Sequence, residues 1–168
     1  MAAKVNALKV TLPSDTEILL TREFDAPRDQ VWEAMTKPEY VKQWWGPRGS
    51  SLSVCEIDFR VGGRYRYVWR KADGYEMGMG GVFQEIVPPA RIVSKELFDE
   101  DWTGGETIGT VTFAEQTGKT LLTQTVLYAS QASRDGALGT GMTSGMAESY
   151  AQLDAYLLSL QDAAKGAA

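Results

Sequence analysis

Side chains that could carry out acid–base, nucleophilic or metal chemistry are scarce in this sequence. The 168 residues include no histidine and a single cysteine, Cys55. The lack of histidine excludes Ser-His-Asp and Cys-His nucleophile pairs, HExxH zinc sites and every histidine-ligated metal. One cysteine forms neither an internal disulfide nor a cysteine-rich metal cage. We therefore expect no metal and no cofactor, and we interpret Cys55, on the apolar side of its predicted strand, as a small buried residue.

The carboxylates offer few candidates for a general acid or base, and we assign no catalytic residue. Glu56 and Asp58 fall between apolar residues of one predicted strand, which places both on its outer face among solvated arginines. Glu76 would point inward only if the side carrying Met77 were the convex face of the sheet. In that case an apolar pocket would raise the pKa of its carboxyl and suit it to act as a base.

Aromatic and methionine side chains form the larger set of site candidates, and their chemistry is the binding of apolar molecules. One strand alternates Tyr65, Tyr67 and Trp69 with polar residues, and phenols need hydrogen-bond partners, so this wall suits an amphipathic ligand. The alternative for each residue is a place in the core, where indoles plug the sheet and methionines fill gaps. The residues that we expect to line a ligand cavity are Trp44, Trp45, Tyr65, Tyr67, Trp69, Met77, Met79, Phe83, Trp102, Met142, Met146 and Tyr150.

The elements that must position these residues follow from the hydrophobic periodicity. Alternation predicts two strands within residues 4–24, and helical spacing then predicts short helices at about 28–36 and 38–45. Turn signals divide residues 51–129 into six strands of an antiparallel meander. Apolar residues recurring every three or four positions predict one long amphipathic helix at about 135–161. The sum is an α+β fold in which a curved antiparallel sheet wraps the last helix, as one domain over residues 1–168 with its core at about 16–160.

Composition limits the partners and the compartment. Apolar residues make up 43% of the chain and the formal net charge is −5, which argues against general nucleic-acid binding. No apolar run approaches the length that spans a membrane, and the first residues lack the pattern of a secretory signal. We expect a cytoplasmic protein with a small-molecule ligand, and a homodimer stays open.

Several motifs, in their order along the chain, carry a resemblance to a known family. They are Phe24-Asp25-Ala26-Pro27, Trp44-Trp45-Gly46-Pro47, residues 55–67, residues 81–89 and Gly141-Met142 ahead of Leu153. In this order they resemble the SRPBCC (START-like) superfamily, in the subgroup related to the C-terminal domain of the activator of Hsp90 ATPase. The resemblance covers roughly residues 16–160. It implies the helix-grip fold, with a deep cavity between sheet and last helix that takes up apolar or amphipathic small molecules in relatives.

Three functions are compatible with these features. The leading hypothesis is the binding of an apolar or amphipathic small molecule in that cavity. The second is a cofactor-independent enzyme of the cyclase or hydrolase type, and the third is a chaperone-associated interaction module. An inward carboxylate or paired phenols would favour the enzyme, an all-apolar cavity the carrier, and a filled cavity the interaction module.

Overall fold

The computed structural model describes residues 6–101 and 103–166, and this part of the chain forms eight strands and four helices. In chain order these are β1 (Lys9–Thr11), β2 (Glu17–Phe24), α1 (Arg28–Thr36), α2 (Pro38–Val41), β3 (Ser50–Ile57), β4 (Arg64–Lys71), β5 (Glu76–Val87), β6 (Arg91–Phe98), β7 (Thr107–Gln116), β8 (Lys119–Leu127), α3 (Gln131–Gly139) and α4 (Met142–Gly166).

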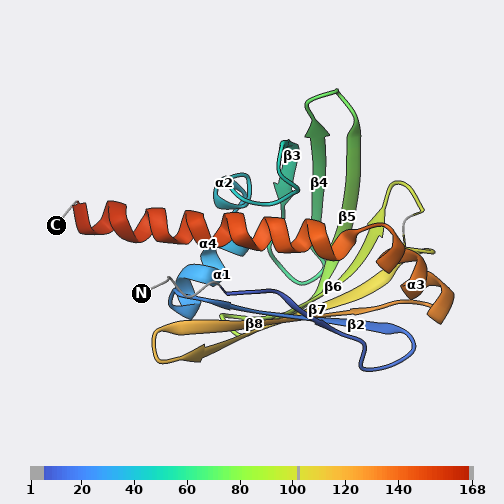
Figure 1. Ribbon diagram of the computed structural model, residues 1–168, viewed down its shortest axis with the longest axis horizontal. Coiled ribbons are helices and arrows are strands. Elements are labelled where there is room, and N and C mark those ends of the chain that lie inside the picture. Colours follow the sequence, from blue (N-terminus) through green and yellow to red (C-terminus); the bar gives the residue numbers. More distant parts are fainter. Residues whose placement is uncertain (1–5, 102, 167–168) are drawn as a thin grey trace.

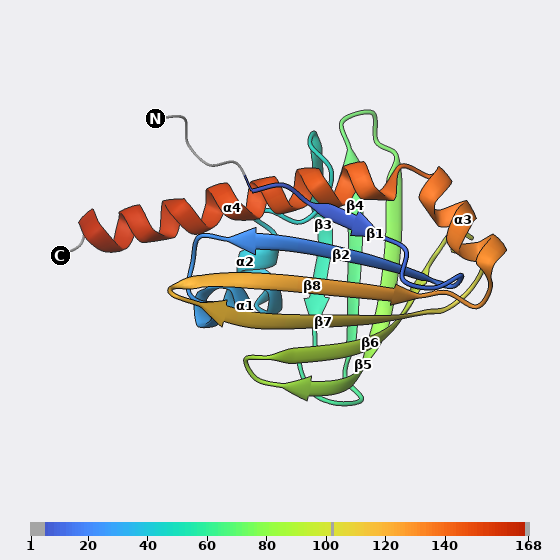
Figure 2. The same cartoon turned by 60° about the horizontal axis from the view of Figure 1, so that its bottom comes forward.

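All eight strands belong to one antiparallel sheet with the order β1-β2-β8-β7-β6-β5-β4-β3. The sheet is strongly curved, because β3 and β4 run across the direction of β2, β7 and β8 (Figures 1 and 2). The long strand β5 takes part in the bend, and its pairing with β6 shifts register between Phe83 and Glu85. An extra residue at such a bulge bends a strand and increases its twist. The predicted α+β helix-grip fold is confirmed.

The long helix α4 lies across the concave side of this sheet (Figure 1). Tyr150, Leu153 and Leu157 recur at helical spacing and are 0–1% exposed, so they form the stripe that holds α4 against the core. The Tyr150 ring packs edge-on against Phe24 of β2, with ring centroids 5.6 Å apart. Among the described residues, no helix combines the length and apolar character required to cross a membrane.

The C-terminal helical region differs from the prediction of one helix at about 135–161. It is divided into α3 and α4 at Thr140 and Gly141, and Gly141 has a φ of +80°. Most residues with a side chain avoid this left-handed conformation, whereas glycine adopts it freely, so the chain changes direction here. The second short helix also ends earlier than predicted, at Val41.

Candidate ligand cavity

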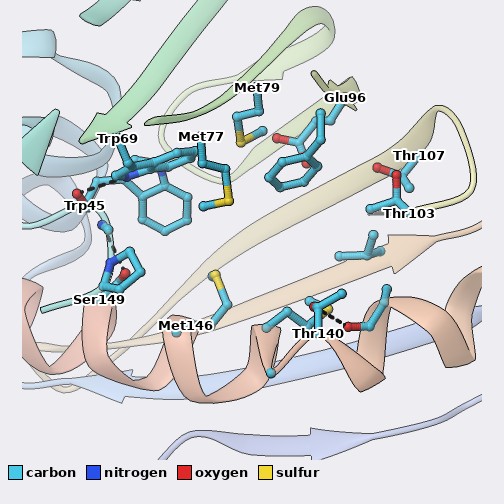
Figure 3. A pocket seen from close by; sticks show the side chains of 18 of the residues that line it. Trp45, Trp69, Met77, Met79, Glu96, Thr103, Thr107, Thr140, Met146 and Ser149 are labelled. Carbon is cyan, nitrogen blue, oxygen red and sulfur yellow. Dashed lines mark hydrogen bonds between the residues drawn. The ribbon is translucent and has the colours of Figure 1, made fainter. Parts of the chain in front are cut away.

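A cavity of about 340 Å³ lies between the concave face of the sheet and the helices α3 and α4 (Figure 3). This volume falls in the range of small-molecule sites in proteins. Strands β4 to β8 supply one wall, the turn after α2 closes one end, and the start of α4 supplies the opposite wall. The lining is rich in aromatic and methionine side chains, among them Trp45, Trp69, Met77, Met79, Phe98, Met142 and Met146.

A second, smaller cavity of about 110 Å³ lies toward α1, α2 and the bend of the sheet. Its lining includes Trp44, Tyr65, Tyr67, Phe83, Phe113 and Tyr150. Three residues, Trp45, Glu96 and Gln124, line both cavities. These three side chains therefore stand at the boundary between the two spaces.

The turn that carries the paired tryptophans is fastened to α4 through its backbone. Ser149 Oγ accepts a hydrogen bond from the Gly46 N–H at 3.1 Å, and Gln152 Nε2 donates to the carbonyls of Trp44 and Gly46. The Trp44 indole donates to the Ala34 carbonyl at 2.9 Å. The Trp45 indole Nε1 is buried, with no hydrogen-bond partner in the described part of the chain. Trp44 is thus fixed by a side-chain hydrogen bond, whereas the Trp45 ring is held by packing against neighbouring aromatic rings and lines both cavities.

The structure gathers the sequence-predicted site residues around these two spaces. Six of them line the larger cavity: Trp45, Trp69, Met77, Met79, Met142 and Met146. Trp45 also lines the smaller cavity, together with Trp44, Tyr65, Tyr67, Phe83 and Tyr150. Trp102 lies outside the described residues.

The aromatic side chains of this set also touch each other. Tyr65, Tyr67 and Trp69 follow one another on β4 with ring centroids 5.4 Å and 6.0 Å apart. The Trp45 ring, which comes from the turn after α2, packs against the rings of both Tyr67 and Trp69. The result is a continuous aromatic wall along one side of the cavities.

The carboxylate in the wall is Glu96 on β6, which the sequence analysis did not consider. Glu76, the carboxylate that was considered, is exposed on the opposite face of β5 from Met77 and lies in neither cavity lining. A sequence signal for Glu96 exists in the alternation of β6. Ile92 and Ser94 are buried, so position 96 must point the same way, and Leu97 is left 51% exposed on the outside.

Cys55 is buried, as expected, and burial raises the pKa of its thiol. Glu56 and Asp58 are on the outer face as expected: Glu56 is exposed opposite Arg66, and Asp58 pairs with Arg60 at 2.9 Å. In the described ranges, no three carboxylate or thiol side chains gather closely enough to hold a metal ion.

Glu96 is hydrogen-bonded to the aromatic wall. The Tyr65 hydroxyl donates to Glu96 Oε2 at 2.6 Å, a length typical of a hydrogen bond to a charged oxygen. Burial raises the pKa of the Glu96 carboxyl above its ordinary value, and the bond from Tyr65 opposes that rise. The pKa of the Tyr65 phenol is raised far above its ordinary value, mainly by burial and secondly by the negative charge of Glu96. Tyr65 therefore stays protonated and donates a hydrogen bond to this carboxylate over the pH range in which proteins are folded.

Other polar groups gather near this carboxylate. The Tyr150 hydroxyl donates to Gln124 Oε1 at 2.6 Å, and the Thr103 hydroxyl donates to the Gly105 carbonyl at 2.6 Å. Figure 3 shows Glu96, Thr103 and Thr107 on one side of the larger cavity, with Trp45 and Trp69 toward its other end. The cavity therefore has a polar end at Glu96, Thr103 and Thr107, while its other end is mainly aromatic and methionine, with Lys71 and Ser149 as polar groups. This distribution suits an amphipathic molecule.

The comparisons with known proteins agree with this geometry. The family described as "Activator of Hsp90 ATPase homolog 1-like protein" matches residues 25–158. The chain belongs to this family. The matched residues of the Hsp90-activator-homologue family run from the turn before α1 into α4, so they include both walls of the larger cavity. None of the curated proteins matches the sequence.

Several solved structures share the fold over nearly the whole chain. A crystal structure from Rhodobacter sphaeroides is 33% identical with a TM-score of 0.86, and the alignment covers 91% of this chain and 99% of that one. One from Mycobacterium smegmatis is 28% identical with a TM-score of 0.82, covering 92% and 99% of the two chains. One from Chromobacterium violaceum is 29% identical with a TM-score of 0.71, covering 86% and 98%.

Proposed function

We propose that this protein binds one apolar or amphipathic small molecule in the larger cavity. The observation that carries the proposal is a space of about 340 Å³ lined mainly by aromatic, methionine and other apolar side chains in the concavity of the sheet. A folded protein gains stability by filling such a volume with its own side chains, so a cavity of this size indicates a purpose other than stability.

The methionines of the lining support the same proposal. Met77 and Met79 project from β5, and Met142 and Met146 project from the start of α4 toward them. Unbranched thioether side chains adapt to ligands of several shapes at little cost. An interaction module without a ligand would be expected to fill this space with its own side chains. The cavity is instead left open by its walls.

Native mass spectrometry of freshly purified protein tests the proposal directly. We expect an added mass of one small molecule on part of the population, which is lost on denaturation. In parallel, the uncharged dye Nile red should bind with a stoichiometry near one and should change the tryptophan fluorescence, because Trp45 and Trp69 line the cavity. A folded protein that neither carries a molecule nor takes up the dye would refute the proposal.

A second candidate function, proton transfer on the bound molecule without a cofactor, is favoured by Glu96 and Tyr65. Burial raises the pKa of the Glu96 carboxyl, and general acids and bases in enzymes include carboxyls whose pKa is raised in this way. It stands beside a phenol that donates at 2.6 Å and at the polar end of a cavity otherwise suited to an apolar substrate. This is the cyclase- or hydrolase-type alternative raised from the sequence.

The two candidates differ in what the variant Glu96→Gln does to a molecule recovered from the purified protein. If the protein is an enzyme, wild type converts that molecule to a product of different mass or retention time, and Glu96→Gln binds it without converting it. If the protein is a carrier, the molecule is recovered unchanged from both. The measurement is chromatography coupled to mass spectrometry after incubation at neutral pH.

A further inference from the structure

The carboxylate in the cavity wall sits in a slot that the sheet register builds for it. Tyr65, Gly81, Glu96 and Thr107 are cross-strand neighbours in one row over β4, β5, β6 and β7. Because Gly81 has no side chain, the Tyr65 ring passes over β5 to reach Glu96. A Cβ at position 81 would clash with the Tyr65 hydroxyl and would lie 2.6 Å from the Lys95 carbonyl oxygen.

The other oxygen of the carboxylate lies over a second glycine. A Cβ at Gly109, on β7, would lie 3.3 Å from Glu96 Oε1, so the glycine at this position keeps the β7 side of that oxygen free. Among the described residues, Tyr65 is the hydrogen-bond partner of Oε2 and no partner is found for Oε1. Glu96 is half-buried and lines both cavities, so Oε1 is an acceptor available to a molecule inside them.

No protein cation neutralises this carboxylate within the described part of the chain. The ionisable groups whose titration is coupled to it are the phenols of Tyr65, Tyr67, Tyr128 and Tyr150, and burial raises the pKa of each, so all four stay neutral. The cation in the lining of the larger cavity is Lys71. Lys71 is six residues beyond Tyr65 on β4, which places it about 20 Å from the row that contains Glu96.

From this arrangement we infer that the ligand of the larger cavity carries a protonated amine, bound at Glu96 Oε1, on an apolar body that lies against the tryptophans and methionines. The inference rests on the proposed binding function and adds the chemical class of the polar end. An ammonium supplies both the hydrogen-bond donor and the positive charge that Glu96 lacks in the protein. A carboxylate at the same place would bring two negative charges together in a poorly solvated space, and an alcohol would supply a donor without charge.

The test compares three probes with the same apolar chain: decylamine, decanol and decanoate, each displacing Nile red from wild-type protein at neutral pH. We expect decylamine to bind about tenfold or more tightly than decanol, because a hydrogen bond to a charged group is worth more than one between neutral groups. Decanoate should bind no more tightly than decanol. The three wild-type measurements decide whether the cavity prefers a protonated amine.

Variants then test whether the preference for decylamine over decanol depends on Glu96. Glu96→Gln should abolish the advantage of decylamine over decanol, whereas the matched control Glu76→Gln, at an exposed carboxylate outside both linings, should keep it. Lys71→Met removes the cation at the far end of the lining and should leave the decylamine advantage intact.

Each other outcome overturns the inference. Equal binding of decylamine and decanol, with Nile red bound one to one, overturns the amine while the proposed function stands. A preference for decylamine that survives Glu96→Gln, or that is equally lost in Glu76→Gln, overturns Glu96 as its site. No binding of Nile red or of any probe overturns the inference and the proposed function together.

Discussion

Replacing Tyr65 by phenylalanine removes one hydroxyl and leaves Glu96 with no donor. The hydrogen bond lost is 2.6 Å long and joins the buried Tyr65 phenol to the half-buried Glu96 carboxyl. Hydrogen bonds to charged groups contribute about 1.5–3 kcal/mol, which for a chain of this size corresponds to a fall in Tm of about 3–12 °C. We expect Tyr65→Phe to lose that much, measured as a urea midpoint at constant slope and as a Tm by circular dichroism.

The cost should also depend on pH. The Tyr65 hydroxyl lowers the pKa of Glu96 against the larger effect of burial, so the carboxyl of folded Tyr65→Phe protein should have a pKa still further above its unfolded value. A folded carboxyl with a raised pKa keeps a proton that the unfolded chain has lost, so stability falls as pH rises from the unfolded to the folded pKa. That fall is deeper in Tyr65→Phe, and the cost of the substitution therefore grows with pH.

The matched control is Tyr75→Phe, which removes the hydrogen bond of 2.8 Å from an exposed tyrosine to Glu100. Because water replaces the lost partner, we expect its midpoint to stay at the wild-type value at every pH. If Tyr65→Phe were no more costly than Tyr75→Phe, or if its cost were independent of pH, the Glu96 carboxylate would not be held by Tyr65 in the way described.

Three further predictions concern the same slot and the walls around it. Glu96→Gln should remove the decline in stability that the raised pKa imposes on wild type, so that its Tm relative to wild type rises as pH increases above the pKa of an unfolded glutamate; a difference in Tm that stays constant with pH would contradict the raised pKa. Gly81→Ala should lower the free energy of unfolding in urea by about 1–3 kcal/mol, because its Cβ would meet the Tyr65 ring and the Lys95 carbonyl. If the variant were as stable as wild type, the Tyr65 ring would be free to move away. Gly136→Ala in α3 and Gly145→Ala in α4 should each raise stability by up to about 1 kcal/mol, since a Cβ at either position meets no atom within 4 Å. Only Gly145 lines the larger cavity, so Gly145→Ala alone should weaken Nile red binding, and an equal effect of both variants would count against the assigned wall.

The features that alternation and periodicity encode were predictable from the sequence. Tyr65, Tyr67 and Trp69 share a face because a strand has a period of two, and Leu153 and Leu157 share a face of the last helix because a helix has a period of 3.6. The division of that helix at Gly141 was not predicted. Several glycines stand in this region, and nothing local distinguishes Gly141, with its positive φ, from Gly139 and Gly145, which remain helical.

The polar end of the cavity could not be assembled from one strand at a time. Charged residues stand outside far more often than inside, so a glutamate between Lys95 and Leu97 is read as solvated unless the burial of Ser94 is given equal weight. The partnership with Tyr65 depends on the register of three strands, and the need for Gly81 appears only when a side chain is seen to cross it. Pairing register is set by tertiary contacts, which composition and spacing do not contain.

Two successive parts of helix α4 have different surroundings. Its first turns present Met142, Gly145 and Met146 to the larger cavity, while Tyr150, Leu153 and Leu157 further on are sealed into the core. A mutation in the first group changes the shape of a space, whereas a mutation in the second removes packing on which the whole domain depends. Under the proposed binding function, substitutions in the first group would change which molecule fits and leave the packing of the fold in place. Within the family, we therefore expect the start of this helix to vary more than the part beyond Tyr150.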